Sequence, residues 1–451
     1  MSTMSITLFG QQYHFVATTS TGWLFVLPGM LLATARVFDW LWPLAIIGLL
    51  TLLVAIQSSK SRLQAGLGIW CSVFVYHLLC LIWFWGAHPL EWATSELWFS
   101  ALLIGVAWFF TALFLSLGSV VFMLVLAVCG HLSKGWLFLF PVVWVANEYL
   151  GQWMFSLLTY GEGVLKGAHF SINMIGYTLA NHSFFLQWSA LGGIYTLSFF
   201  VALTATVVYW LGLKLERTQQ FKYGVTFILF LYATAPVFDY LHSRGGEENG
   251  GSELQAGLIH TNLLKNDHQT FSEKYKSVRD IISTHDTRQL DVLVFPELLS
   301  VVEEMLFEDK VWLQSQINNE TVLIDSKITS KGEGTVLEAY SATLQASEAI
   351  PVYEKQFLMP MGEYIPQIVA DTFKLLSLQE LFDSARAQVS EHHAGSVHET
   401  MTIAGVSAEV RFCSEILSPS LSQVNKSNRP ALMINLASHS FFGSNPLLLA
   451  Q

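Results

Sequence analysis

Charged residues are scarce in this chain. Asp, Glu, Lys and Arg make up only 13% of its 451 residues, whereas soluble globular domains carry about a quarter. Much of the chain is therefore expected to face something other than water. The net charge of −11 also argues against a nucleic-acid partner, because nucleic acids attract basic surfaces.

Cysteine is scarce as well, which limits the possible disulfides. Three of the four cysteines, Cys71, Cys80 and Cys129, lie in apolar stretches. Cys413 is the single cysteine of the polar C-terminal part, so it has no disulfide partner there. Such a thiol is either an inert buried side chain or a nucleophile, and composition does not decide between them.

Apolar residues are abundant, at 52% of the chain, and they are concentrated before residue 240. A helix needs about 20 apolar residues to cross a bilayer, and roughly seven segments are candidates on this criterion. The segment 151–183 has no clean span and is expected to be a loop or re-entrant segment. The candidate spans are 22–35, 40–56, 66–85, 97–128 (with a possible break near Gly118), 136–150, 185–213 and 223–240.

Basic residues in the short loops indicate the orientation. They collect on the cytoplasmic side of membrane proteins. Arg36 departs from an alternating pattern, and Lys166 lies in the ambiguous fifth loop. The N-terminus is therefore expected inside, and the chain after about residue 242 outside. No cleavable signal peptide is recognisable, so the first helix is expected to be a retained anchor. The basic residues in even-numbered loops are Lys60, Arg62, Lys134, Lys214, Arg217 and Lys222.

The chain after the apolar region reads as a soluble α/β domain. Apolar runs predict strands in six places, and 269–285 has helical spacing. Strands that alternate with helices indicate an α/β sandwich. We therefore expect a bundle over 1–241, a glycine-containing linker over 242–252 and the soluble domain over 253–451. The predicted strands are 254–260, 291–295, 321–324, 336–344, 402–412 and 431–436.

Three residues of this domain are candidates for chemistry. Glu297 follows the buried run DVLVFP, which brings a carboxylate to the end of a strand, where α/β sheets keep their sites. Lys355 lies in a stretch rich in Pro and Gly, and Cys413 follows a strand-like run. Singly, a solvated lysine and an inert thiol are the commoner outcomes. Together they supply a base, a cation and a nucleophile, which is what thiolate chemistry requires.

The histidines His392, His393 and His398 suggest a metal cluster at first sight. They have no second ligand group at the spacing usual for zinc. A mobile loop is the simpler interpretation, and neither a metal nor a cofactor is expected.

The order Glu297, Lys355, Cys413 resembles the arrangement of the nitrilase (carbon–nitrogen hydrolase) superfamily. The flanking sequences PMGEYIP and FCSEIL are similar to those of its apolipoprotein N-acyltransferase branch, which joins such a domain to a membrane bundle. In the bundle, PVVWVANEYLGQWMFSLLTYG and QWSALGGIYTLSFFVAL resemble the fifth and sixth helices of that family.

The resemblance implies a membrane α-helical bundle with a nitrilase-like αββα sandwich on the extracytoplasmic side of a bacterial inner membrane. It implies an acyltransferase that moves a fatty acyl chain from phospholipid, through a cysteine thioester, to the N-terminal amine of a lipoprotein or to another amine acceptor. Glu297 would be the base, Lys355 the oxyanion-stabilising cation and Cys413 the nucleophile. Glu363 and Glu415 match two supporting acids.

The chain departs from this family in three places. The segment HTNLLKNDHQTF lacks the family's tryptophan, SHSFFG replaces NDAWFG, and the chain stops at Gln451 where the family continues. The domain is therefore expected to be C-terminally shortened, with an exposed strand edge. Two alternatives stay open. One is a nitrilase-like membrane amidase or acyltransferase of a conjugal-transfer system, and the other is a degenerate relative that only binds lipid or a partner.

Overall fold

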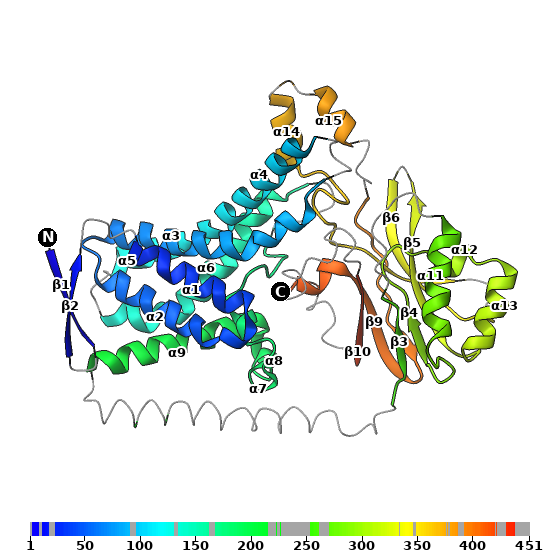
Figure 1. Cartoon of the computed structure of the whole chain (residues 1–451), viewed down its shortest axis with the longest axis horizontal. Helices are drawn as coiled ribbons and strands as arrows, with labels where there is room; N and C mark the ends of the chain where they lie inside the picture. The colour runs from blue at the N-terminus through cyan, green and yellow to red at the C-terminus, as the bar shows by residue number, and fades with distance from the viewer. Residues whose placement is uncertain are drawn as a thin grey trace.

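The computed structural model of this chain contains a helical bundle and an α/β domain that lie side by side (Figure 1). The described residues are 2–8, 11–17, 23–90, 96–129, 134–161, 167–214, 222, 226, 253–260, 270–332, 334–345, 349–375, 377, 379–386, 392–419, 421 and 430–437.

The bundle consists of helices joined by short 3-10 turns, preceded by an N-terminal hairpin. Its core is almost wholly aliphatic and aromatic. The elements are β1 (Ser2–Leu8), β2 (Gln11–Ala17), α1 (Trp23–Val37), η1 (Asp39–Leu41), α2 (Pro43–Gln57), α3 (Arg62–Cys80), η2 (Leu81–Ala87), α4 (Leu97–Ser116), η3 (Leu117–Ser119), α5 (Val120–Cys129), α6 (Lys134–Leu158), η4 (Ile175–Leu179), α7 (Ser183–Leu186), α8 (Ser189–Gly192) and α9 (Ile194–Lys214).

Three helical stretches among the described residues are long and apolar enough to cross a membrane. They are Arg62–Ala87, Leu97–Cys129 and Ile194–Gly212, with 26, 33 and 19 residues. The helices α1 and α2 are apolar but shorter, at 15 residues each. The prediction of a membrane-type helical part is therefore confirmed, while the predicted span 223–240 lies outside the described residues apart from residue 226.

Two predicted boundaries in the bundle were wrong. The helix α6 runs on to Leu158, because 151–158 is still apolar and helix-compatible, so the predicted irregular segment begins later than residue 151. The sixth span begins later than residue 185, because Gly193 has a φ of +63° and separates α8 from α9. The break expected near Gly118 is present as η3.

A polar stripe on α6 binds the irregular segment that follows this helix. Glu148, Gln152 and Ser156 lie one helical turn apart and are all buried. The Glu148 carboxylate accepts from the Ile175 N–H at 2.8 Å, and Gln152 donates to the Ile172 carbonyl at 2.6 Å. The Ser156 hydroxyl accepts from the backbone N–H of residue 167 at 3.0 Å. The stripe thus satisfies backbone groups for which a membrane offers no water.

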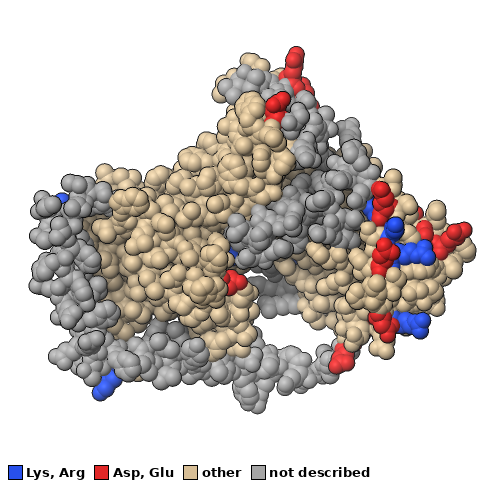
Figure 2. Space-filling view, viewed as in Figure 1, with Lys and Arg blue, Asp and Glu red and all other residues tan. Residues whose placement is uncertain are grey.

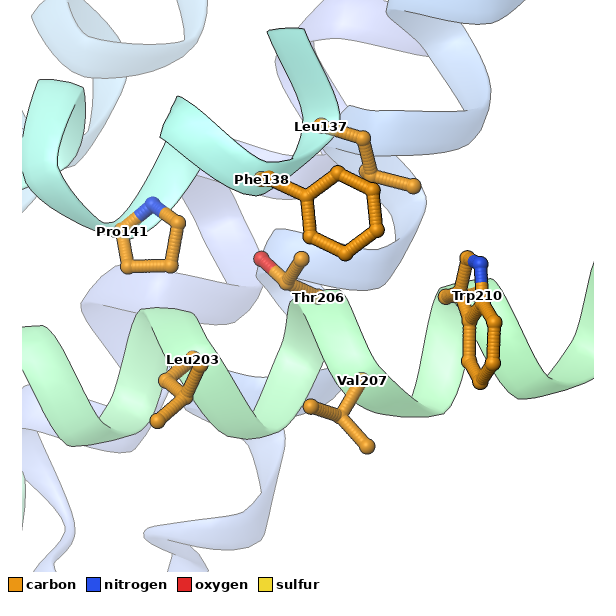
Figure 3. A pocket seen from close by; sticks show the side chains of 7 residues that line it. All are labelled: Leu137, Phe138, Pro141, Leu203, Thr206, Val207 and Trp210. Atoms are coloured by element: carbon orange, nitrogen blue, oxygen red, sulfur yellow. The ribbon is translucent and has the colours of Figure 1, made fainter. Parts of the chain in front are cut away.

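An apolar groove lies on the bundle surface between α6 and α9 (Figure 3). The hydroxyl of Thr206, the one polar side chain in its wall, donates to the Ala202 carbonyl at 2.8 Å. The groove therefore presents hydrocarbon to its surroundings, as a lipid-facing surface should. Its lining residues are Leu137, Phe138, Pro141, Leu203, Thr206, Val207 and Trp210.

The α/β domain has a helical layer and two sheets (Figure 1). The larger sheet has the order β3-β4-β5-β6-β7, parallel as far as β5 and antiparallel beyond it; the smaller has the order β10-β9-β8. The elements are β3 (Ala256–Leu258), α11 (Phe271–Ser283), β4 (Val292–Val294), α12 (Val301–Glu304), α13 (Phe307–Gln316), β5 (Val322–Lys331), β6 (Gly334–Ala342), β7 (Ile350–Glu354), α14 (Gln367–Leu375), α15 (Gln379–Arg386), β8 (Met401–Ile403), β9 (Val406–Phe412), η5 (Cys413–Leu417) and β10 (Leu432–Leu436).

Two apolar cores hold these layers together. One packs α11, α12 and α13 on the outer face of the larger sheet, through residues such as Val278, Leu313 and Leu323. The other lies between the sheets and joins Ile324 to Val410 and its neighbours. Figure 2 shows that, in this view, the charged side chains of the described residues gather mainly over the outer helices, whereas the bundle is nearly bare of them. The α/β class predicted from the sequence is present.

The strand predictions needed two corrections. The run 402–412 is a hairpin of β8 and β9 that turns at Ala404 and Gly405, both with positive φ. The strand β7 was not predicted from the sequence. Its sequence, IPVYE, has proline as the second residue, and its apolar and polar residues do not alternate regularly. Among the described residues, one strand follows Cys413: β10, at the edge of its sheet.

We predict that Gly118→Ala destabilises the bundle. A Cβ on Gly118 would lie 2.1 Å from the Asn147 carbonyl oxygen of α6, so the helices must separate, and overpacking of this kind costs about 1–3 kcal/mol. Thermal unfolding in detergent measures the effect. Gly105→Ala in α4 is the control, because its Cβ would meet its nearest atom at 3.8 Å. Equal melting temperatures for the two variants would contradict the prediction.

Candidate active site

Lys355 is the centre of a buried cluster of ionisable side chains in the α/β domain. It follows the last residue of β7, and 1% of its surface is exposed. Its backbone N–H donates to the Leu337 carbonyl at 2.9 Å, and its carbonyl accepts from the N–H of Gly395 at 2.8 Å. Its ammonium group donates to Glu297 at 2.9 Å and to Glu363 at 2.6 Å. The cation is therefore fixed at both its backbone and its tip.

Glu297 lies in the turn after β4 and is held by residues of β5. The Leu298 N–H donates to the Ser326 hydroxyl at 2.8 Å. The neighbouring Asp325 accepts from the Val302 N–H at 2.9 Å and from the Tyr340 hydroxyl at 3.1 Å. These two supporting residues were not predicted from the sequence. Their signal was a pair of polar residues, Asp-Ser, in the middle of a buried strand.

Cys413 lies at the junction of β9 and η5 in a strained conformation. Its φ is +40°, a left-handed value that costs a non-glycine residue about 1–3 kcal/mol. Its carbonyl accepts from the Asn435 side chain of β10 at 3.2 Å. Strain of this kind persists only where the surroundings fix the backbone, and at Cys413 they do.

Glu415 joins the turn of the cysteine to the turn of the lysine. One carboxylate oxygen accepts from the backbone N–H groups of Gln356 and Phe357 at 2.7 and 2.9 Å, and the other accepts from Phe412 at 2.9 Å. The Tyr353 hydroxyl adds a fourth bond at 3.0 Å. Glu415 is 1% exposed. Its buried carboxylate therefore links the backbone of the cysteine turn to the backbone of the lysine turn.

Glu363 is held by its own tight turn. Its second carboxylate oxygen accepts from the Met359 N–H at 2.8 Å, and Met361 in between has a φ of +65°. Its carbonyl accepts from the N–H of His392 at 2.8 Å.

The histidine segment 392–398 is packed against neighbouring residues and is not the mobile loop predicted from its composition. The His392 ring bonds to the Thr335 hydroxyl at 2.8 Å, and His398 lies 3.3 Å from Glu409. Gly395 is required at its position, because a Cβ there would lie 2.1 Å from the Cβ of Glu354. No group of three potential metal ligands occurs in the described part of the chain.

Burial and charge set the protonation of this cluster. Burial raises the pKa of Glu297, and the Lys355 ammonium only partly opposes that shift. Burial lowers the pKa of Lys355, but Glu297 and Glu363 outweigh it, and the net shift is upward. Burial and the Glu297 carboxylate raise the pKa of the Cys413 thiol to about 12, although Lys355 opposes them. The resting thiol is therefore protonated at neutral pH, with a carboxylate and a cation beside it.

All five site residues predicted from the sequence lie in this one cluster. Lys355 contacts Glu297 and Glu363 directly, and its ammonium lies 5.8 Å from the ring centroid of Phe412, the residue before Cys413. Glu415 holds the backbone on both sides of them. A thiol, a carboxylate and a fixed ammonium in this arrangement can form a thioester and stabilise a tetrahedral oxyanion.

The chain was then compared with known proteins. Residues 28–207 match the model of the apolipoprotein N-acyltransferase N-terminal domain. A protein of Azotobacter vinelandii named apolipoprotein N-acyltransferase is 23% identical, over 95% of this chain and 80% of the relative. Proteins of the same name from Rickettsia prowazekii and Geobacter metallireducens are 22% and 23% identical, over 52% and 67% of this chain.

These last two alignments span about half of each relative, 45% and 56% of its length. The family model covers the bundle, and the Azotobacter alignment extends through the α/β domain. Both parts of the molecule are therefore similar in sequence to proteins named apolipoprotein N-acyltransferase.

Proposed function

We propose that this chain is a membrane-bound N-acyltransferase that carries a fatty acyl chain as a thioester on Cys413. The donor is a phospholipid, and the acceptor is the N-terminal amine of a lipoprotein. The observation that carries the proposal is the buried Lys355 ammonium between Glu297 and Glu363, next to a thiol. The names of the relatives supply the reaction class.

In the first half-reaction, Glu297 takes the thiol proton as the sulfur of Cys413 attacks the ester carbonyl of the donor. An ammonium group has three N–H donors, and those of Lys355 include two that point to Glu297 and Glu363. The third stabilises the oxyanion of the tetrahedral intermediate. The intermediate expels the lysophospholipid oxygen, which takes the proton back from Glu297 and leaves the thioester.

In the second half-reaction, an uncharged amine attacks the thioester carbonyl. Glu297 removes a proton from the attacking nitrogen, and Lys355 again stabilises the oxyanion. The thiolate of Cys413 leaves and regains the proton from Glu297, so the enzyme returns to its starting state with an amide formed. Glu363 keeps Lys355 charged and oriented in both steps.

The finer architecture belongs to the same proposal. We assign 1–241 to the bundle, 242–252 to the linker and 253–451 to a nitrilase-like αββα sandwich. Two packed sheets with helices on one outer face support the sandwich. The relatives carry only the N-acyltransferase name, so the conjugal-transfer alternative is not put forward. The buried, hydrogen-bonded cluster argues against a degenerate relative.

The proposed location is the bacterial inner membrane, with the α/β domain outside the cytoplasm. The α6 helix begins at Lys134 and ends where it meets this domain, since the Gln367 N–H donates to the Tyr160 carbonyl at 2.7 Å. Lys134 is therefore at the far end of the bundle, in keeping with the positive-inside rule. Arg36, the residue that departs from the rule, is buried over the Tyr177 ring at 5.1 Å.

We predict that reporter fusions after Lys60 and after Gly250 lie on opposite sides of the membrane. A cytoplasmic reporter should be active only at the first position, and an extracytoplasmic reporter only at the second. A fusion after Lys214 is the control and should behave like the one after Lys60. Activity of one reporter at both Lys60 and Gly250 would refute the topology.

We predict a covalent acyl adduct on Cys413 when the full-length protein is incubated with phospholipid vesicles. Mass spectrometry of the Cys413 peptide should show the added acyl mass, and Cys413→Ala should lose both the adduct and all transfer. Cys71→Ala is the matched control, because Cys71 lies in α3 of the bundle. Normal transfer by Cys413→Ala would rule out the thioester mechanism.

We predict an acid limb in the pH profile of kcat/KM that depends on Glu297. Because burial raises the pKa of Glu297 above the ordinary 4.5, the base is lost as pH falls through a value above 4.5. Glu297→Gln should lower the rate by about 10²–10⁴-fold and remove this limb. An unchanged limb in Glu297→Gln would assign the base to another group.

A further inference from the structure

Among the described residues, the turns that carry Cys413, Lys355 and Glu363 all contact the bundle. The turn of Glu297, in contrast, is held from within the α/β domain by Ser326 and Asp325. The three bundle contacts come from one short stretch of chain, the end of α6 and the segment 167–171.

The first contact fixes the turn of Glu363. The hydroxyl of Tyr364 donates to the carbonyl of Thr159, the residue directly after α6, and the Gln367 N–H donates to the Tyr160 carbonyl at 2.7 Å. The Tyr364 ring lies so close to Gly161 that a Cβ there would be 2.6 Å from it. Tyr364 directly follows Glu363, so this contact fixes the end of the turn.

The second contact fixes the turn of Lys355. The His169 ring lies against the Phe357 ring, with centroids 4.7 Å apart. The Phe357 N–H donates to Glu415 at 2.9 Å. Phe357 is therefore held by its ring from the bundle and by its backbone from the cysteine turn, two residues after Lys355.

The third contact fixes the turn of Cys413. Both the backbone N–H and the hydroxyl of Ser171 donate to the Leu417 carbonyl, at 3.1 and 2.8 Å. Leu417 is the last residue of η5, which begins at Cys413. The Ser171 hydroxyl also bonds to the Tyr177 hydroxyl at 2.5 Å. The short helix with the strained cysteine is thus tied to the bundle at its far end.

The segment that makes these contacts is itself fixed. Ser156 of α6 binds the backbone N–H of residue 167, and Gln152 binds the carbonyl of Ile172 directly after the segment. His169 and Ser171 are both buried. A shift of this part of the bundle would therefore also move the turns that carry Lys355, Glu363 and Cys413. A fixed geometry of this kind is what precise placement of reacting groups requires.

We propose that residues 159–161 and 167–171 of the bundle position the active site, with His169 and Ser171 as positioning residues for Lys355 and Cys413. The inference rests on the proposed function, because it assigns a role in acyl transfer to residues that touch neither substrate nor reacting atoms. The membrane part thereby takes part in catalysis beyond anchoring the domain.

The test measures single-turnover acylation of Cys413 in the full-length protein, using vesicles with a fluorescent acyl chain. His169→Ala and Ser171→Ala should each slow acylation about three- to tenfold, the effect expected for one lost hydrogen bond or ring contact. The loss should lie in the maximal rate, with the lipid concentration at half-maximal rate unchanged. His169→Phe and Ser171→Thr should restore it, because they keep the ring and the hydroxyl.

Two matched controls come from the bundle itself. His182 packs its ring against Trp42 and Phe185, and the Thr204 hydroxyl bonds to the Phe200 carbonyl within α9. His182→Ala and Thr204→Ala remove the same kinds of contact without touching the catalytic turns. Both should acylate at the wild-type rate, and thermal unfolding of every variant separates misfolding from misplacement.

A second readout keeps this inference separate from the proposed function. The rate at which iodoacetamide alkylates Cys413, followed by peptide mass spectrometry across pH, reports on the thiol without any lipid. A shifted profile in His169→Ala and Ser171→Ala supports the positioning role even if the wild type forms no acyl adduct, which would count against the proposed function alone. Wild-type acylation and alkylation in both variants, or equal losses in the two controls, would overturn the inference.

Discussion

The buried ammonium of Lys355 is the constraint on which the site depends. Taking an ion out of water costs several kcal/mol unless opposite charges and hydrogen bonds replace the water. Glu297 and Glu363 do so, and each in turn must be delivered by a turn of fixed shape. Removing either carboxylate would leave the buried ammonium with one carboxylate partner and one fewer hydrogen bond, so each of the three side chains depends on the others.

Backbone strain is concentrated in the turns around this cation. Seven described non-glycine residues have a positive φ, and four of them lie in the turns of this cluster: Leu298, Ser300, Met361 and Cys413. Each such conformation is unfavourable and persists only where neighbouring contacts fix it. The dense hydrogen bonding of Glu415 and Asp325 provides these contacts. The polar residues buried in this domain thus support geometry rather than overall stability.

The site residues could be predicted from the sequence because each follows or lies beside a recognisable local signal. Glu297 follows a buried strand and a proline, and Cys413 ends an alternating run. The supports could not be predicted, because Glu148, His169 and Ser171 act through contacts with residues far away in the chain. The composition of the histidine segment 392–398 also led to a wrong prediction, that of a mobile loop. The order of this segment comes from backbone bonds to Lys355 and Glu363 and from contacts of its histidine rings, and composition does not show these partners.

The polar stripe of α6 has a consequence for how the bundle can move. A rotation of the helix by a single residue, about 100°, would turn Glu148 and Gln152 away from their backbone partners and towards hydrocarbon, where ionisable groups are costly. These bonds therefore fix the rotation of α6 about its own axis. Any rearrangement of the bundle must therefore tilt α6 and its attached segment as one body, or proceed through helices without such a stripe.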